Sequence, residues 1–283
     1  MRALLFAGAL IAAAAAASTA SACREYVGPR PYVAAEPSPD EWDFVYKAAR
    51  ASYPEIRTTA KSCTGLSVPG TLVAGYKAGL TTAAAQARFG TDRPLLGVLF
   101  FDMLLESGAS VPGERPGTRW EADFLLVVGD ARINAARTRE QALAGLRGYR
   151  PFIEIPVLPS AEGRALAAAD LAAVNVGAWR GVFGDERPLS ANALTSLADM
   201  RVRAFDGSGA LLAEGKGSDA LGHPLDVVLW VKDQVLAQGG RLRPGDIISV
   251  GAFTPLTPPK AGQTIRVRYE GLPDDPEVSV RFR

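Results

Sequence analysis

Residues 120–128 read WEADFLLVV, and this apolar run predicts a buried β-strand. Side chains two positions apart on a strand share a face, so we expect Glu121 and Asp123 side by side. Two neighbouring carboxylates on a buried strand repel each other and resist desolvation. A divalent cation would remove both penalties, because carboxylate oxygens are good ligands for Mg²⁺, Mn²⁺ and Ca²⁺. From spacing alone, a solvent-facing strand edge explains the pattern better, since E-x-D is common.

A third acid lies in another apolar segment. Residues 152–155 read FIEI, inside a strand predicted over residues 150–158. Glu154 would complete a site of three carboxylates with open positions for substrate and water.

The rest of the chain alternates strand and helix signals. Helices are predicted over residues 138–146, 165–174 and 224–238, with His223 as a helix-start residue, and strands over residues 246–253, 264–269 and 277–282. Asp206-Gly207-Ser208-Gly209 indicates a hairpin between residues 197–205 and 210–215. The pattern predicts an α+β fold, with a helical N-terminal part over residues 38–110 and a strand-rich body over residues 111–283.

Within the N-terminal part, residues 75–81 read GYKAGLT at the end of a strand predicted over residues 72–80. The flanking glycines allow close backbone approach to Lys77, and a partly buried lysine has a tunable pKa. Lys77 is therefore a candidate for moving protons or binding a carboxylate, although most lysines lie at the surface. Asp102 is a lone acid in the apolar run 95–105, where it either pairs with Lys77 or caps a turn.

The first segment has the pattern of a targeting signal. Residues 1–22 combine a basic start, an apolar run and a small-residue ending, which is typical of a secretory signal peptide. Cleavage there would leave Cys23 at the N-terminus, followed by an extended arm over residues 23–37. Plain export, with Cys23 free or bonded to Cys63, is favoured over a lipid anchor at Cys23, and the location is periplasmic or extracellular. No later stretch of about 18 apolar residues predicts a spanning helix.

Composition excludes several classes of function. A formal net charge of +1 gives no field for a nucleic-acid backbone. The sequence contains one His and two Cys, too few for a multi-His metal centre or a Cys-rich zinc site.

The motifs, taken in order, resemble one family. GYKAGLT (75–81) is similar to the GYKxGLT segment of the 2-keto-4-pentenoate hydratases, which belong to the fumarylacetoacetate hydrolase superfamily. GVLFFDM (97–103) resembles the segment that follows it there, and LGHPL (221–225) and LRPGDII (242–248) resemble C-terminal segments. The resemblance covers about residues 39–282; each motif alone is weak, but their ordered combination is specific.

The resemblance implies a β-roll of mixed sheet and a bound Mg²⁺ or Mn²⁺. Glu121, Asp123 and Glu154 match the metal ligands, and Lys77 and Asp102 match residues that line the substrate pocket. In the hydratases a small 2-oxo or 2-hydroxy acid chelates the metal, which stabilises a dienolate. The implied activity is that of a lyase, which tautomerises 2-hydroxypenta-2,4-dienoate and adds water at C4. Lys77 would relay a proton or neutralise the substrate carboxylate, and by analogy the chain forms a homo-oligomer.

Several positions depart from the family pattern. Asp123 replaces a Glu, Pro156-Val157-Leu158 follow Glu154 where another acid is usual, and Val174-Asn175 stand where the family has Asp-Asn. No His precedes His223, which disfavours the hydrolases of the superfamily. Two alternatives stay open, the first because the same enolate serves loss of CO₂ and the second because of these departures and the signal peptide. One is a 2-oxo-3-enedioate decarboxylase, and the other is an exported, non-catalytic binding protein on the same scaffold.

Overall fold

Two mixed β-sheets form the framework of the molecule. The structure is a computed structural model, and it describes residues 73–158 and 165–283. The larger sheet contains β1 (Val73–Gly79), β2 (Leu95–Phe100), β3 (Leu104–Glu106), β5 (Glu121–Val128), β6 (Leu146–Ile155), β7 (Arg180–Phe183), β8 (Arg187–Pro188) and β11 (Ile247–Ser249). The smaller sheet contains β4 (Ala109–Val111), β9 (Arg201–Asp206), β10 (Leu211–Lys216), β12 (Thr264–Glu270) and β13 (Glu277–Phe282).

The strand order brings distant parts of the chain together. The larger sheet runs β2-β1-β11-β5-β6-β7-β3, with β8 paired to β6, and the smaller sheet runs β10-β9-β12-β13-β4. The pairs β1–β11, β3–β7 and β4–β13 are parallel, and the other pairs are antiparallel. Strand β11, which comes from the C-terminal third of the chain, therefore lies between β1 and β5, and these two strands carry candidate site residues.

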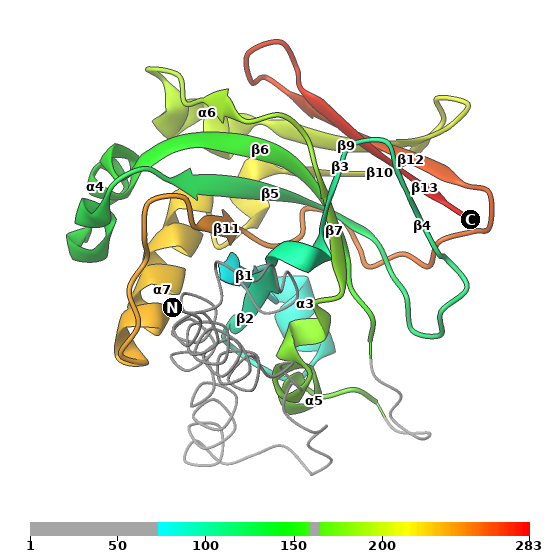
Figure 1. Ribbon diagram of the computed structural model, residues 1–283, viewed down its shortest axis with the longest axis horizontal. Coiled ribbons are helices and arrows are strands. Elements are labelled where there is room, and N and C mark those ends of the chain that lie inside the picture. The colour runs from blue at the N-terminus through cyan, green and yellow to red at the C-terminus, as the bar shows by residue number, and fades with distance from the viewer. Residues whose placement is uncertain (1–72, 159–164) are drawn as a thin grey trace, which may run out of the picture.

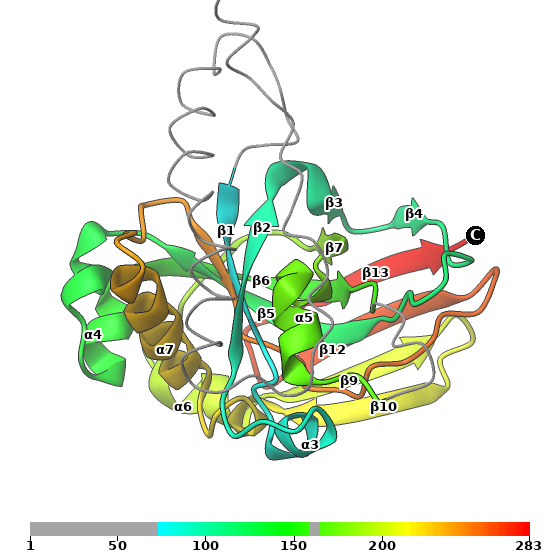
Figure 2. The same ribbon diagram turned by 90° about the horizontal axis from the view of Figure 1, so that it is seen from below.

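Helices gather mainly at one end of the sheets. They are α3 (Ala83–Arg88), α4 (Arg139–Ala144), α5 (Ala168–Ala173), α6 (Ala193–Asp199) and α7 (Pro224–Ala237), with short 3-10 helices η2 (Phe101–Met103), η3 (Ala131–Ala135), η4 (Asn175–Gly177) and η5 (Gly217–Asp219). Helix α4 contacts α6 and α7 at the end of the molecule opposite β4 and β13 (Figures 1 and 2). Helices α3 and α5 lie apart from this group, near β1 and β2 (Figure 2).

Capping side chains mark the starts of two helices, one of which the sequence predicts at His223. Thr82 accepts a hydrogen bond from the Ala85 N–H (3.1 Å) at the start of α3, and Nδ1 of His223 accepts one from the Leu225 N–H (3.0 Å) at the start of α7. Such caps satisfy N–H groups that have no partner within the helix. Helix α4 ends at Ala144, with Gly145 as its C-cap, before the predicted end at residue 146, because Leu146 already belongs to β6.

Two predicted strands are longer than the observed ones. The hairpin of β9 and β10 is confirmed, but β9 begins at Arg201 because α6 occupies residues 193–199. Strand β11 spans only residues 247–249 of the predicted 246–253. Both differences arise where an apolar run continues into a helix or a loop that packs on the core, so burial alone does not mark the strand end.

Strand β5 has two different faces, although all of its residues are buried. Ala122, Phe124 and Leu126 belong to the main core, which also includes residues of α7 and of the smaller sheet. The alternate residues, from Glu121 onward, point to the other face, where Leu125 and Val127 form a separate apolar cluster. Burial on both faces explains the nearly continuous apolar sequence, and the two acids interrupt only one of the faces.

Tyr269 of β12 fastens β5 to β6 beside Asp123. Its hydroxyl oxygen accepts a hydrogen bond from the Phe152 N–H (3.0 Å) and lies within bonding range of the backbone carbonyls of Asp123 and Phe152. Burial raises the pKa of Tyr269 well above its usual range. The hydroxyl therefore remains a neutral donor that holds the smaller sheet against the two strands of the candidate site.

We expect Tyr269→Phe to lower the free energy of unfolding by about 1–3 kcal/mol, because it leaves buried backbone groups without a partner. Tyr149→Phe is the matched control. Tyr149 is also buried, but its hydroxyl has no hydrogen-bond partner among the described residues, so its removal should cost close to nothing. Urea unfolding of both variants measures the difference, and equal losses would contradict the role assigned to Tyr269.

The predicted boundary at residues 110 and 111 does not coincide with a break in the structure. Strands β1 and β2 share a sheet with β5, and β4 pairs with β13. The described part of the predicted helical segment consists mainly of strands, with α3 as its one α-helix. The predicted signal peptide, the predicted arm, residues 38–72 of the predicted helical part and both cysteines lie outside the described residues. None of the helices in the described part combines the length and the hydropathy needed to cross a bilayer.

Candidate active site

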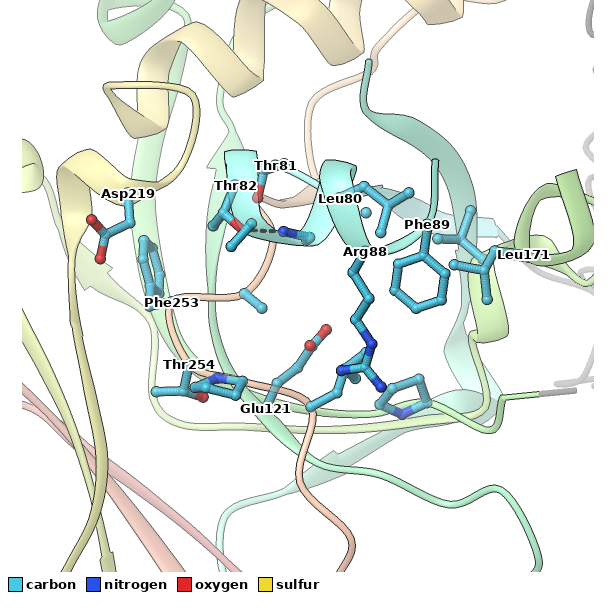
Figure 3. A pocket seen from close by; sticks show the side chains of 18 of the residues that line it. Leu80, Thr81, Thr82, Arg88, Phe89, Glu121, Leu171, Asp219, Phe253 and Thr254 are labelled. Atoms are coloured by element: carbon cyan, nitrogen blue, oxygen red, sulfur yellow. Dashed lines mark hydrogen bonds between the residues drawn. The ribbon is translucent and has the colours of Figure 1, made fainter. Parts of the chain in front are cut away.

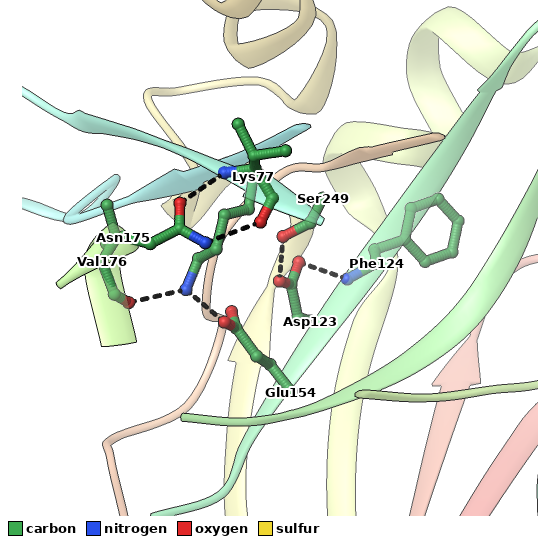
Figure 4. A network of polar contacts seen from close by, with 8 residues as sticks. Lys77, Asp123, Phe124, Glu154, Asn175, Val176 and Ser249 are labelled. Carbon is green, nitrogen blue, oxygen red and sulfur yellow. Dashed lines mark hydrogen bonds and ion pairs between the residues drawn. The ribbon is translucent and has the colours of Figure 1, made fainter. Parts of the chain in front are cut away.

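Three acids from two adjacent strands share one face of the larger sheet. Glu121 of β5 is the direct cross-strand partner of Glu154 of β6, and Asp123 follows two residues along β5. Their side chains are buried, with exposures of 9%, 1% and 0% for Glu121, Glu154 and Asp123. Lys77 of β1 reaches the same region across β11 (Figure 4). The sheet thus brings together four of the residues predicted from the sequence.

Lys77 forms an ion pair inside the protein. Its Nζ donates hydrogen bonds to Oε1 of Glu154 and to the carbonyl oxygen of Val176 (3.1 Å). A Cβ at position 97 would lie 2.8 Å from Cγ of Lys77, so Gly97 on β2 leaves the space that the lysine stem needs. Lys77 is 2% exposed, which makes it a buried cation rather than a surface lysine.

Asn175 fixes the backbone that receives Lys77. Its side-chain amide pairs with Val98 of β2 as a neighbouring strand would: Oδ1 accepts from the Val98 N–H (2.8 Å) and Nδ2 donates to the Val98 carbonyl (2.9 Å). The next residue, Val176, has φ 54°, a left-handed conformation that is costly for a β-branched side chain. The contacts of Asn175 hold this conformation, which directs the Val176 carbonyl at Lys77. No sequence signal predicts a role for this carbonyl.

Asp123 is held by a residue that the sequence analysis did not single out. The hydroxyl of Ser249 on β11 donates a hydrogen bond to Oδ2 of Asp123, and the Phe124 N–H donates to Oδ1 (2.5 Å). Ser249 pairs with Lys77 along β1 and with Leu125 along β5. Its contact with Asp123 follows from that strand pairing, which the sequence does not reveal.

Burial makes the carboxyl groups of Glu121 and Asp123 reluctant to ionise. Desolvation raises the pKa of Glu121 well above its usual range; the charge of Glu154 adds to the shift, and Lys77 opposes it. Desolvation and then the charge of Glu154 raise the pKa of Asp123 to about 7, although the Ser249 hydrogen bond acts in the opposite direction. One ammonium faces three carboxylates, so two negative charges lack a counterion when all of the groups are ionised.

These residues fit a divalent cation. All three donors are hard carboxylate oxygens, two positive charges would balance the site, and Oε2 of Glu154 is buried without a hydrogen-bond partner among the described residues. In this conformation, no group of three or more His, Cys, Asp or Glu side chains in residues 73–158 and 165–283 is arranged to hold a metal ion. Asp123 faces Ser249 and Glu154 faces Lys77, so ligation of one ion by all three acids requires their side chains to move from these positions. The assignment of the three acids as ligands stays a prediction.

In metal-free protein we expect Asp123 to make stability depend on pH. Its pKa is about 7 in the fold against an ordinary value of 3.8, so the folded state binds the proton more tightly. The contribution of Asp123 to stability is therefore complete below pH 4 and is lost as the pH rises to about 7, at roughly 1.4 kcal/mol per pH unit at most.

Asp123→Asn isolates this effect, because the variant keeps every other titrating group. We expect the stability of the wild type minus that of the variant to fall between pH 4 and 7 in EDTA, and the fall to shrink in excess Mg²⁺. Denaturant unfolding at each pH measures this difference. A difference that stays constant or rises over this interval would contradict the raised pKa.

Lys77 and Glu121 line a pocket of 560 Å³, and Figure 3 shows Glu121 in its wall. Its wall is formed largely by α3 and by residues 252–256, with Pro156 and Leu158 on another side. This volume is typical of sites for small ligands. The pocket gives a small organic acid access to one of the three carboxylates and to the buried lysine. The side chain of Asp102, which belongs to η2, lies outside the described part of the structure, and its role stays a prediction.

No family model matches the chain, but its sequence is similar to those of several 2-keto-4-pentenoate hydratases. The protein is 32% identical over 206 residues to 2-keto-4-pentenoate hydratase 1 of Dechloromonas aromatica, an alignment that covers 72% of this chain and 76% of the relative. It is 29% identical over 204 residues to 2-keto-4-pentenoate hydratase 2 of the same organism, with the same coverage.

Solved structures show the same fold. A 4-oxalocrotonate decarboxylase from Pseudomonas putida G7, complexed with magnesium and adipate, has a TM-score of 0.66 at 21% identity and matches over 99% of both chains. A fumarylpyruvate hydrolase from Pseudomonas aeruginosa, in complex with Mn²⁺ and pyruvate, has a TM-score of 0.55 at 17% identity, over 75% of this chain and 89% of the other. The predicted fumarylacetoacetate-hydrolase-like fold is thereby confirmed, and the sequence relatives place the chain in the 2-keto-4-pentenoate hydratase family.

Proposed function

We propose that the protein is a metal-dependent hydro-lyase that adds water to a small 2-hydroxy-dienoate or to its 2-oxo acid form. The observation that carries the proposal is the convergence of Lys77 and three buried acids on one face of the sheet. Lys77 and one of the acids, Glu121, also line a pocket of suitable size. The names of the sequence relatives and the divalent ions in the related structures support it.

The acids Glu121, Asp123 and Glu154 would hold Mg²⁺ or Mn²⁺. A bound divalent cation acts as a Lewis acid, which stabilises negative charge on the oxygens of a 2-oxo acid. Ser249 orients the Asp123 carboxylate by its hydrogen bond, and Lys77 orients Glu154. Such partners fix ligands in one direction, and their loss weakens a site even though they do not touch the ion.

Lys77 would supply the proton that hydration needs. Adding water across a carbon–carbon double bond places hydroxyl on C4 and a proton on the neighbouring carbon. An ammonium has three N–H donors, and the described contacts of Lys77 use two of them, at Glu154 and Val176. The third can be directed at the substrate from a residue that lines the pocket.

Metal removal tests the proposal directly. We expect the purified protein to hydrate 2-hydroxypenta-2,4-dienoate in Mg²⁺ or Mn²⁺, to lose at least about 99% of that rate in EDTA, and to recover it when the metal is restored. Loss of dienoate absorbance gives the rate, and NMR identifies the product. Equal rates with and without metal, or no reaction at any metal concentration, would contradict a metal-dependent hydratase. Binding of the acid without turnover would instead identify a non-catalytic binding protein.

A second candidate is a 2-oxo-3-enedioate decarboxylase, which uses the same kind of enolate and releases CO₂. The specific observation in its favour is a guanidinium, that of Arg88, in the pocket wall where a second carboxylate can reach it. Measurement of CO₂ released from 2-oxohex-3-enedioate separates the two reactions.

We also propose, on sequence grounds alone, that the protein is exported and forms a homo-oligomer. Cleavage before Cys23 would shorten the chain, and an acyl anchor on Cys23 would add to its mass. Plain export without the anchor is favoured. Mass spectrometry of the protein from its native cells measures that mass, and the intact 283-residue chain would contradict cleavage. Light scattering tests the expected homo-oligomer.

A further inference from the structure

Arg88 places a positive charge in the wall of the active-site pocket. It is the last residue of α3, and its side chain reaches toward the wall that carries Glu121 (Figure 3). The guanidinium lies 5.5 Å from the centre of the Phe89 ring, so an aromatic side chain supports it. The residue is exposed to the pocket and to solvent, in contrast to the buried Lys77.

Arg88 has no counterion among residues 73–158 and 165–283. Some exposed arginines in this part of the chain are paired, such as Arg139 with Asp226 at 2.6 Å, and several others are not, but Arg88 is the arginine that lines the pocket. Of the two acids in the pocket wall, Glu121 belongs to the three-carboxylate site, and Asp219 accepts a hydrogen bond from the Lys216 N–H (2.7 Å). The guanidinium is thus available to a ligand.

The pocket wall has two kinds of polar region. Lys77 and Glu121 mark the proposed reaction centre, and Arg88 provides a separate cation. Apolar side chains line much of the remaining wall, including Leu80, Phe89, Leu158 and Leu171. A ligand that matches this wall has a polar head, a short hydrocarbon body and an anionic tail.

We infer that Arg88 binds the distal carboxylate of a dicarboxylic 2-oxo acid, so that the site binds diacids more tightly than monoacids of the same chain length. The inference rests on the proposed function, because the 2-oxo acid head occupies the reaction centre that Lys77 and the acids form. A planar guanidinium can donate two parallel hydrogen bonds to one carboxylate, which a lysine ammonium cannot reproduce. Arg88 is therefore a specificity-determining residue, and it takes no part in proton transfer.

Two acids that differ only in the distal group test this inference. 2-Oxohexanedioate and 2-oxohexanoate have the same chain length and the same head, but only the first has a second carboxylate. Calorimetry in Mg²⁺ measures binding without turnover. We expect the wild type to bind the diacid about tenfold more tightly than the monoacid.

Variants assign the preference to one side chain. Arg88→Met should abolish the tenfold preference and leave the affinity for 2-oxohexanoate unchanged, because the hydrocarbon stem of methionine retains the apolar contacts. Arg88→Lys should keep a part of the preference, since it retains charge but loses the bidentate geometry. Arg93→Met is the matched control: Arg93 is exposed, pairs with Asp92 and does not line the pocket, so the preference should be unchanged.

Each outcome separates the inference from the proposed function. Equal binding of the two acids by the wild type, or a preference that survives in Arg88→Met, would overturn the role of Arg88 and leave the hydratase proposal standing. Failure of both acids to bind in the presence of Mg²⁺ would overturn the proposed function, and with it the inference.

Discussion

Replacing Lys77 with methionine should lower the turnover of 2-hydroxypenta-2,4-dienoate about a thousandfold. General acid catalysis by a positioned side chain contributes a factor of roughly 10²–10⁴, and Lys77 is the buried lysine in the pocket wall that we propose as the proton donor. The substitution also leaves Glu154 without the cation that it faces. Steady-state rates at saturating metal give the effect on turnover, and a rate above one-tenth of the wild type would contradict the assigned role.

Lys232→Met is the matched control for this experiment. Lys232 is also buried, with 5% exposure, but its Nζ donates to the Ala136 carbonyl (2.6 Å) and pairs with Asp233, on α7 and away from the pocket. Its loss should reduce stability and leave turnover per folded molecule within about twofold of the wild type. If both variants lost turnover equally, the effect of Lys77→Met would reflect general disruption of the fold.

Glu121→Gln should weaken Mg²⁺ binding about a hundredfold and at the same time stabilise the metal-free protein. Removal of a ligand charge lowers affinity for the ion, and even partners outside the ligand set change affinity by roughly 10–100-fold. In the metal-free state Glu121 is buried beside Glu154, and burial raises its pKa well above the usual range. A neutral amide avoids that desolvation penalty, so unfolding in EDTA should require about 1–4 kcal/mol more than for the wild type above pH 7.

The opposite signs of these two effects make the test specific. Calorimetry with Mg²⁺ gives the affinity, and urea unfolding in EDTA gives the stability. Glu106→Gln, at the exposed end of β3, serves as the control and should change neither quantity. Wild-type metal affinity in Glu121→Gln would show that this residue is not a ligand, whatever the change in stability.

The sequence was sufficient for the features that depend on local pattern. Alternation along residues 120–128 placed Glu121 and Asp123 on one face, and the start of α7 at His223 followed from residue type. Lys77 was singled out by its flanking glycines, and the structure places it among the acids.

Other parts of the site depend on contacts between distant segments, for which a single sequence carries no signal. Ser249 meets Asp123 only because β11 inserts between β1 and β5. The Val176 carbonyl is a backbone group whose direction is set by the contacts of Asn175 with β2. The division at residue 110 was drawn from changes in local texture, whereas strand pairing joins both sides of it into the same sheets. Arg88 resembled any surface arginine until α3 was placed over the pocket.

The reacting groups and the pocket wall lie on different parts of the fold, which has an evolutionary consequence. The proposed reacting groups are anchored on β1, β5 and β6, whose positions are fixed by a core that both sheets share. Much of the pocket wall instead belongs to α3 and to the loop of residues 252–256, which pack on that core from one side. Mutations in these segments could therefore broaden or narrow the range of substrates while the reaction itself stays unchanged.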